Sequence, residues 1–190
     1  HKEYRRQRQM CIRDSAKKID GAVFPGQQGG PLEHAIAAKA VAFREASHPS
    51  FALYTDQVVT NARAFATALV NEGFRVVSNG TDNHQVIIDL RDFDAELTGK
   101  EAQEVLDRAG ITTNRNQIPD DPRSPFVTSG LRLGTPAQTT AGMKEGEFAT
   151  IASLLARALR QRASDSDVET VRSDVAALCA NFNPYGHFVS

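Results

Sequence analysis

Apolar residues recur at helical spacing in the first half of the chain. Between about Phe51 and Glu72 they lie three or four residues apart, which predicts one long helix, and Gly73 is the stop expected at its end. The preceding stretch, from Leu32 to Ala46, is apolar on most faces. A helix of that kind is normally buried, so we expect this second helix to be covered by other parts of the protein.

The period of the pattern changes to two after Gly73, and this predicts strands. The segments are Phe74–Ser78, Gln85–Leu90, Ile111–Asn114 and the glycine-bounded Gly130–Gly134. One helix is expected between the capping box at Thr98–Glu101 and Gly110, and two more over about Lys144–Arg162 and Asp167–Phe182. Elements in this order predict a small sheet covered by helices, an α+β domain.

Composition and charge exclude several classes of protein. The 190 residues are 41% hydrophobic and 24% charged with a formal net charge of −1, which argues against a nucleic-acid or anionic-membrane partner. No apolar run reaches the roughly 18 residues of a membrane span. Cys11 and Cys179 form no metal motif, and His84 has no ligand partner at a suitable spacing. We therefore expect a cytoplasmic protein without a metal site.

The start of the chain departs from this pattern. Residues 1–18 hold seven basic and two acidic residues and show no helical or strand period. A basic arm for nucleic acid is one interpretation, but no partner motif supports it. We expect residues 1–15 to be a foreign or misread leader, disordered and outside the fold.

The loop Phe24–Pro31 carries two adjacent glycines, Gly29 and Gly30. It is either a plain turn or an anion site, because N–H groups of residues without a Cβ can approach an oxyanion closely. Pro31 is well placed to be the first residue of the next helix, whose N-terminus would add its positive dipole. The loop is neither GxGxxG nor a Walker loop, so the pattern alone leaves both interpretations open.

Arg132 lies between Leu131 and Leu133 in the glycine-bounded strand, so an alternating strand puts it on the opposite face from the leucines. The simple interpretation is an ordinary exposed arginine. The functional one is a carboxylate receptor, since a guanidinium on a rigid strand can bind a carboxylate bidentately.

The loop from Asn116 to Phe126 is stiff because each of its three prolines fixes its own φ and restricts the residue before it. It is a rigid surface loop, a proline-rich ligand for an aromatic groove, or a preformed wall for a flat ligand. In the last case Phe126 would supply a ring and Asn116 an amide.

Together these segments resemble the serine hydroxymethyltransferase family. The resemblance covers about residues 16–185, and several independent strings occur in the family's order and spacing. These strings are Ala22–Leu32, Ala38–Phe43, Gly80–His84, Leu97–Ala102, Ser124–Gly130 and Arg132–Ala137.

The resemblance implies the C-terminal part of a pyridoxal-phosphate-dependent transferase of fold type I. Long helices would lead into a small α+β domain with a short, mostly antiparallel sheet covered by helices. Residues 16–48 would end the large cofactor-binding domain, 49–72 would form a connecting helix, 73–185 the C-terminal domain and 186–190 a tail. The intact enzyme is expected to be a homodimer that transfers the hydroxymethyl carbon of serine to tetrahydrofolate, giving glycine and 5,10-methylenetetrahydrofolate.

The resemblance also implies roles for single residues. Gly29 and Gly30 match residues whose N–H groups hold the cofactor phosphate of the neighbouring subunit, and Arg132 matches the residue that holds the amino acid carboxylate. The residues that match those lying against the folate are Asn116, Ser124, Pro125 and Phe126.

No catalytic residue is assigned in this chain. The family's Schiff-base lysine is followed by a glycine-rich run that is lacking after Lys2, so whether Lys2 is a relic of that lysine stays open. We therefore expect the chain by itself to be inactive.

Two other functions remain possible at this point. A non-catalytic amino-acid-binding or regulatory α+β module would need Arg132 but no cofactor. A different enzyme of the same cofactor fold would need the cofactor but no folate, and the string Ser124–Gly130 argues against it.

Overall fold

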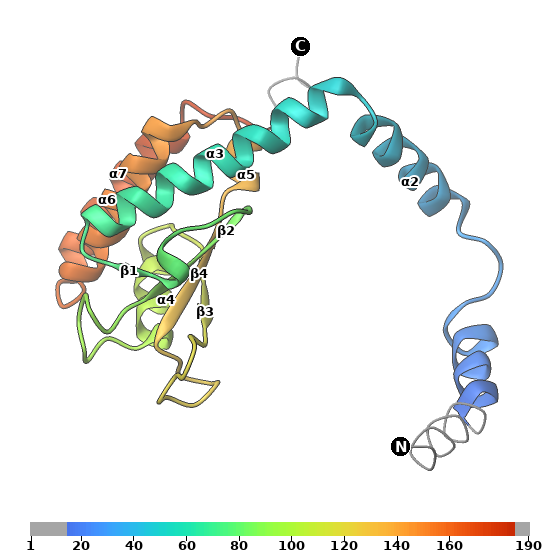
Figure 1. The fold of residues 1–190 in the computed structure, drawn as a ribbon, viewed down its shortest axis with the longest axis horizontal. Coiled ribbons are helices and arrows are strands. Elements are labelled where there is room, and N and C mark those ends of the chain that lie inside the picture. Colours follow the sequence, from blue (N-terminus) through green and yellow to red (C-terminus); the bar gives the residue numbers. More distant parts are fainter. Residues whose placement is uncertain (1–14, 185–190) are drawn as a thin grey trace. The chain divides into compact units, whose positions relative to one another are not determined.

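The computed structural model describes residues 15–184. The described residues do not include positions 1–14 of the expected leader 1–15, which contain Lys2, or any of the expected tail 186–190. The chain divides into two compact units, one ending at His48 and the other beginning at Pro49. Figure 1 traces both, and each is described by itself.

The first unit consists of exposed helical segments. Residues 15–21 are helical, the short helical stretch η1 (Ala22–Gln27) is interrupted by the extended residue Phe24, and α2 (Glu33–Ala46) follows. The helix predicted over residues 32–46 is thus confirmed.

The expected burial of α2 is not observed within the described part of its own unit. No residue of α2 is buried, and Ile36, Val41 and Phe43 are 56%, 57% and 72% exposed. The apolar side chains of α2 therefore have no cover within the described part of their own unit.

The second unit contains a four-stranded antiparallel sheet. Its strands are β1 (Arg75–Val76), β2 (Gln85–Asp89), β3 (Asn114–Asn116) and β4 (Gly130–Gly134). They lie in the order β1-β2-β4-β3, and every neighbouring pair is antiparallel. This confirms the mixed α/β class and the short antiparallel sheet.

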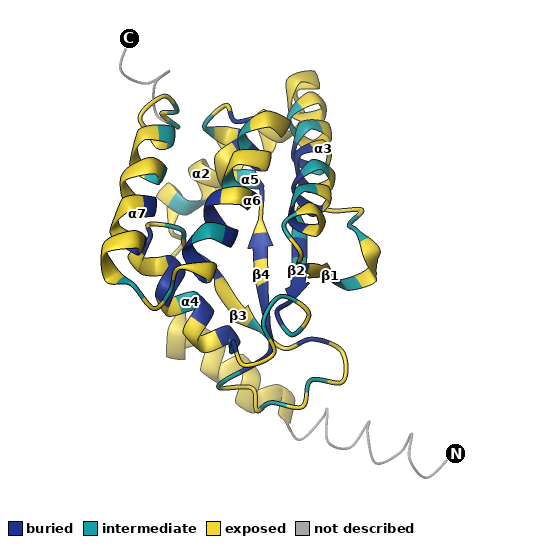
Figure 2. Cartoon of the chain, turned by 90° about the vertical axis from the view of Figure 1, so that its left-hand side faces the viewer, coloured by how far each residue is buried: buried dark blue, intermediate teal, exposed yellow. Residues whose placement is uncertain are grey.

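Helices pack on one face of the sheet. They are α3 (Pro49–Asn71), α4 (Gly99–Arg108) and α6 (Glu145–Arg160), and α7 (Asp165–Cys179) packs against α4 and α6. The core between helices and sheet includes Ile88, Leu131, Leu106 and Leu155, each 0% exposed. Figure 2 shows buried residues along α3, α6 and β4. The sheet is therefore covered by these helices on one side.

Helix α3 ends where the sequence predicts. Gly73 has a φ of +94°, a left-handed conformation that glycine adopts without strain. Its N–H donates to the carbonyl of Val70, and the N–H of Phe74 donates to that of Leu69. This hydrogen-bond pair is a Schellman motif, which satisfies carbonyls at the end of a helix.

Two predicted strands have different limits in the structure. The first stops at Val76, and a 3-10 turn follows in which Ser78 has a φ of +63°. The third begins at Asn114 rather than Ile111, because the N–H of Ile111 donates to the carbonyl of Leu106 and so completes the end of α4. In both places a helical or turn hydrogen bond replaces a strand bond.

The short helix α5 (Pro136–Thr140) was not predicted. It is attached to α3 by buried polar groups: Asn61, 0% exposed, donates to the hydroxyl of Thr139 and to the carbonyl of Met143. The hydroxyl of Thr135 donates to the carbonyl of Val58 at 2.9 Å. These contacts fix the chain directly after β4.

Gly130 tests how tightly the sheet is packed. A Cβ at this position would lie 2.5 Å from Ile118 Cγ2, 2.6 Å from the carbonyl oxygen of Ile88 and 3.0 Å from that of Asn116. Because two of these atoms are backbone, Gly130→Ala is expected to lower the free energy of unfolding by about 1–3 kcal/mol, measured by urea denaturation.

The matched control is Gly134→Ala at the other end of the same strand. There the nearest atoms to a Cβ are 3.8 Å away, so the free energy of unfolding is expected to change little. Equal effects of the two substitutions would contradict this account.

Candidate substrate site on the open face of the sheet

The sheet has a second face that the helices of its unit do not cover, and we call it the open face. Strand alternation puts Arg132 on it, in register with Ile87 of β2 and Asn114 of β3. The next row holds Asp89, Gly130 and Asn116.

The backbone of Arg132 is fixed by strand pairing on both sides, while its guanidinium has no partner among the described residues. Leu131 and Leu133 on either side are buried, at 0% and 6% exposure, while Arg132 is exposed. This confirms the predicted alternation. Within residues 15–184 the guanidinium of Arg132 has no hydrogen bond or ion pair. A fixed backbone with an unpaired fork of donors can receive a carboxylate.

Asn116 ends β3 on the same face, one row from Arg132. It is half-buried, and its Nδ2 donates to the carbonyl of Gln117 at 2.6 Å. The bond fixes the amide plane at the point where the chain leaves the sheet, and it leaves the amide oxygen as an acceptor.

The loop that joins β3 to β4, residues 117–129, is organised by the carboxylate of Asp121. That carboxylate accepts hydrogen bonds from the N–H of Ile118 at 3.3 Å and of Arg123 at 2.9 Å. It also accepts from the N–H and the hydroxyl of Ser129, at 2.9 and 2.7 Å. One side chain thus ties the beginning of the loop to its end.

The outside of the loop is bound to the segment before α4. The guanidinium of Arg123 donates to the carbonyls of Leu97 and Ala95, both at 2.7 Å. The N–H groups of Gly99 and Lys100, at the N-terminus of α4, donate to the carbonyls of Thr128 and Val127. Loop carbonyls therefore cap a helix whose first N–H groups have no partner within the helix.

Between these anchors the chain turns at Ser124, Pro125 and Phe126. The carbonyl of Ser124 accepts from the N–H groups of Val127 and Thr128. All three residues are exposed, and Phe126 is 80% exposed. A fixed turn thus presents an uncovered aromatic ring, as the stiff-loop interpretation predicts.

Sequence reasoning missed Asp121 and Arg123 as the residues that hold this loop. A signal was present, because an Asp side chain commonly bonds to the N–H two residues further on, as Asp121 does with Arg123. The remaining partners of Asp121 lie eight residues away or come from the loop start, and no local pattern indicates them.

Two carboxyl groups near the site have a lowered pKa. Burial raises the pKa of Asp121, but the hydrogen bonds from the Arg123 N–H and from Ser129 outweigh burial and hold it below its usual value. Burial likewise raises the pKa of Asp89, and hydrogen bonds from the side chain and N–H of Arg91 outweigh it. Both groups are therefore charged at neutral pH.

Gly29 and Gly30 belong to the first unit. Both are exposed, a Cβ at either would meet no atom within 4 Å, and their N–H groups have no acceptor among the described residues. The prediction that Pro31 is the first residue of the next helix is wrong. Leu32 is the N-cap, and α2 starts at Glu33. The structure thus brings Arg132, Asn116 and residues 124–126 into one unit and leaves the glycines in the other.

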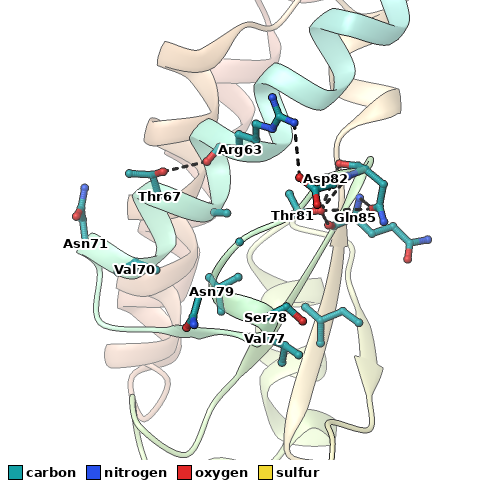
Figure 3. Close-up of a pocket in the computed structure, with 15 residues that line it drawn as sticks. Arg63, Thr67, Val70, Asn71, Val77, Ser78, Asn79, Thr81, Asp82 and Gln85 are labelled. Carbon is teal, nitrogen blue, oxygen red and sulfur yellow. Dashed lines mark hydrogen bonds and ion pairs between the residues drawn. The ribbon is translucent and has the colours of Figure 1, made fainter.

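A cavity lies away from these residues, between α3 and the connection from β1 to β2 (Figure 3). It measures about 760 Å³, and the ion pair of Arg63 with Asp82, 3.6 Å long, lies in its wall. Asn83 Oδ1 accepts from the N–H of Gln85, and Thr81 Oγ1 donates to the Gln85 carbonyl. These bonds confirm the turn predicted at 81–84.

The fold and the site define the class of protein. It has a mixed α/β unit, and the open face of its sheet presents Arg132, which is unpaired among the described residues. The loop 117–129, with the exposed ring of Phe126, connects the strand of Arg132 to its neighbour β3. The family model described as serine hydroxymethyltransferase matches residues 2–155. A curated serine hydroxymethyltransferase of Nostoc punctiforme is 54% identical over 171 residues, which is 90% of this chain and 40% of that relative. The chain belongs to the serine hydroxymethyltransferase family. It spans about two-fifths of the length of this relative.

Among residues 15–184, no helix is long and apolar enough to cross a membrane. The same residues contain no group of three or more His, Cys, Asp or Glu side chains arranged to hold a metal ion.

The lowered pKa of Asp121 predicts a pH dependence of stability. A carboxyl group whose pKa is lower in the folded state stabilises the fold above its unfolded pKa of about 3.9, and this contribution is lost as the pH falls through the folded value. The loss in unfolding free energy caused by Asp121→Asn should therefore be largest near pH 7 and shrink below about pH 4.

The measurement is urea unfolding of wild type and variant across this pH range. Asp120→Asn is the control, because Asp120 is exposed and its carboxylate has no hydrogen bond among the described residues. A loss for Asp121→Asn that does not change with pH would contradict the prediction.

Proposed function

We propose that the whole protein transfers the hydroxymethyl group of serine to tetrahydrofolate, giving glycine and 5,10-methylenetetrahydrofolate. Family membership supports this, as does the name of the Nostoc punctiforme relative. The observation that carries it within this chain is the unpaired guanidinium of Arg132 on the open face. In an enzyme of this class, that position is where the carboxylate of serine binds.

Arg132 fixes the amino acid through two parallel hydrogen bonds to its carboxylate. Because the guanidinium is planar and its strand is rigid, these bonds restrict the rotation of the bound serine as well as its position. Holding a substrate in one orientation lowers the entropic part of a reaction barrier. The role of Arg132 is therefore to bind and to orient.

The folate would lie against Asn116 and the turn Ser124–Phe126. The ring of Phe126 and the flat face of Pro125 offer apolar contact to a planar heterocycle. The Asn116 amide oxygen and the Ser124 hydroxyl offer hydrogen bonds at its edge. All four residues come from β3 or the loop that follows it.

Pyridoxal phosphate fits the residues present in the first unit. Gly29 and Gly30 have exposed N–H groups without acceptors and no side chain in the way, which is the donor set that a phosphate takes. When bound, this cofactor supplies the electron sink for cleavage of the bond between Cα and Cβ of serine. The lysine that anchors it is not assigned in this chain, so we expect the chain by itself to be inactive.

We further propose a cytoplasmic homodimer acting in one-carbon metabolism and glycine formation. In the family the glycines matched by Gly29 and Gly30 serve the neighbouring subunit, so one subunit completes the site of the other. The uncovered apolar residues of α2, such as Val41 and Phe43, agree with a unit that needs further polypeptide around it.

The alternative is a non-catalytic module that binds an amino acid. One observation favours it: Arg132, Asn116 and the loop are assembled within the second unit alone. If the chain is such a module, its 190 residues bind serine or glycine without the cofactor. Calorimetric titration of the chain with serine distinguishes the two functions, because the proposed enzyme needs its remaining polypeptide and pyridoxal phosphate.

The proposed function is tested in a completed enzyme, in which this chain is joined to the part of the Nostoc punctiforme relative that it does not cover. After loading with pyridoxal phosphate, we expect cofactor absorbance and formation of methylenetetrahydrofolate from serine. A loaded, folded enzyme without this activity would contradict the proposal.

In the completed enzyme, Arg132→Lys is expected to raise the KM for serine about tenfold or more. A hydrogen bond to a charged group is worth about 1.5–3 kcal/mol, and lysine cannot form the bidentate pair. Steady-state kinetics measures the change. Arg115→Lys is the control, because Arg115 is exposed on neighbouring β3 but pairs with Leu131 and so points away from the open face.

The folded state should be unaffected by the substitution, since the Arg132 guanidinium has no hydrogen bond or ion pair among residues 15–184. An unchanged KM for serine in Arg132→Lys, or an equal rise in Arg115→Lys, would show that Arg132 does not bind the substrate.

A further inference from the structure

Asp121 has more hydrogen bonds than its place in an exposed loop requires. Three backbone N–H groups and one hydroxyl converge on its two oxygens, at 2.7–3.3 Å. Oδ1 accepts from the Arg123 N–H and the Ser129 hydroxyl, and Oδ2 accepts from the N–H groups of Ile118 and Ser129. The residues bound to Asp121 come before and after the exposed turn 124–126.

We propose that Asp121 is a positioning residue for the folate cosubstrate: it fixes the turn Ser124–Phe126 in the conformation that receives the pterin ring. This inference rests on the proposed function and adds a residue to it. Asp121 acts through the loop backbone and does not itself touch the substrate.

The geometry explains why a single carboxylate can have this effect. Outside the turn, Arg123 is bound to Leu97 and Ala95, and the N-terminus of α4 is bound to Val127 and Thr128. Asp121 bonds to the N–H of Arg123 and to Ser129, next to Thr128. Asp121 thus connects the two anchored ends, and the turn between them has little freedom.

An ordered turn favours binding through entropy. A loop that is mobile before binding loses backbone and side-chain freedom when the ligand orders it, and this loss weakens binding. Phe126 is 80% exposed, so contacts of its own ring do not hold it in place. The bonds of Asp121 supply that order in advance.

Asparagine cannot replace Asp121 although it has the same shape. Each carboxylate oxygen accepts from at least one backbone N–H, and an N–H group can only donate. Whichever oxygen becomes an NH₂ group, at least one N–H loses its acceptor. Asp121→Asn is therefore expected to loosen the loop while leaving the helices and the sheet in place.

The first test uses the 190-residue chain and trypsin. The bond after Arg123 lies at the start of the turn, and the Arg123 side chain is held by two carbonyls. We expect cleavage at this bond to be at least fivefold faster in Asp121→Asn than in wild type. Asp120→Asn is the matched control, because Asp120 is exposed, has a φ of +53° that asparagine also adopts readily, and makes no side-chain hydrogen bond among the described residues.

The second test uses the completed enzyme loaded with pyridoxal phosphate. We expect Asp121→Asn to raise the KM for tetrahydrofolate at least tenfold, with the calorimetric Kd for serine within twofold of wild type. If Asp121 had a purely structural role, the KM for tetrahydrofolate and the Kd for serine would rise together. Asp120→Asn should leave both constants unchanged.

The outcomes separate this inference from the function on which it rests. If wild-type enzyme is active and the KM for tetrahydrofolate in Asp121→Asn stays within twofold, the positioning role is wrong and the function stands. If serine binding weakens as much as folate binding, the role is structural and the inference is wrong. Inactivity of the loaded wild type would instead contradict the proposed function, while the tryptic test would still report on the loop.

Discussion

The pairing of β4 with two antiparallel neighbours is the constraint on which the site depends. Because β4 pairs with β2 and with β3, its backbone cannot rotate, and its side chains must alternate between the two faces. Leu131 and Leu133 enter the core, and Arg132 points out on the open face. The burial of the leucines thus determines the direction in which the cation points.

The same pairing determines where the loop begins and ends. Asn116 and Gly130 are partners across β3 and β4, so the residues between them must leave and re-enter the sheet at one place. Ile118 packs over Gly130 so closely that no Cβ fits there. Asp121 then closes the loop, and Arg123 attaches it to the segment before α4. Rigid backbone around an exposed ring is a consequence of these contacts.

Much of the fold could be predicted from local signals. The periodic helix α3, the stop at Gly73, the N-cap at Thr98 and the alternation in β4 depend on residues close in sequence. Of the predicted capping box only the bond from the Glu101 N–H to the Thr98 hydroxyl forms, because the Glu101 carboxylate accepts from Arg162 instead. Predictions were wrong where a local hydrogen bond competed with the expected element, as at Ile111, which completes α4 before the strand starts. The helix α5 was missed because bonds from α3, 77 and 78 residues away in the sequence, stabilise it.

The sequence by itself determined the types of group in the site: a strand arginine, a proline-stiffened loop with a phenylalanine, and two adjacent glycines. Only the tertiary structure decided which of them share one unit, and that the loop is held by Asp121. The physical reason is that spacing along the chain reports hydrogen bonds between near neighbours. The bonds that join Asp121 to Ser129, Arg123 to Ala95 and Asn61 to Met143 form only once the chain has folded back on itself.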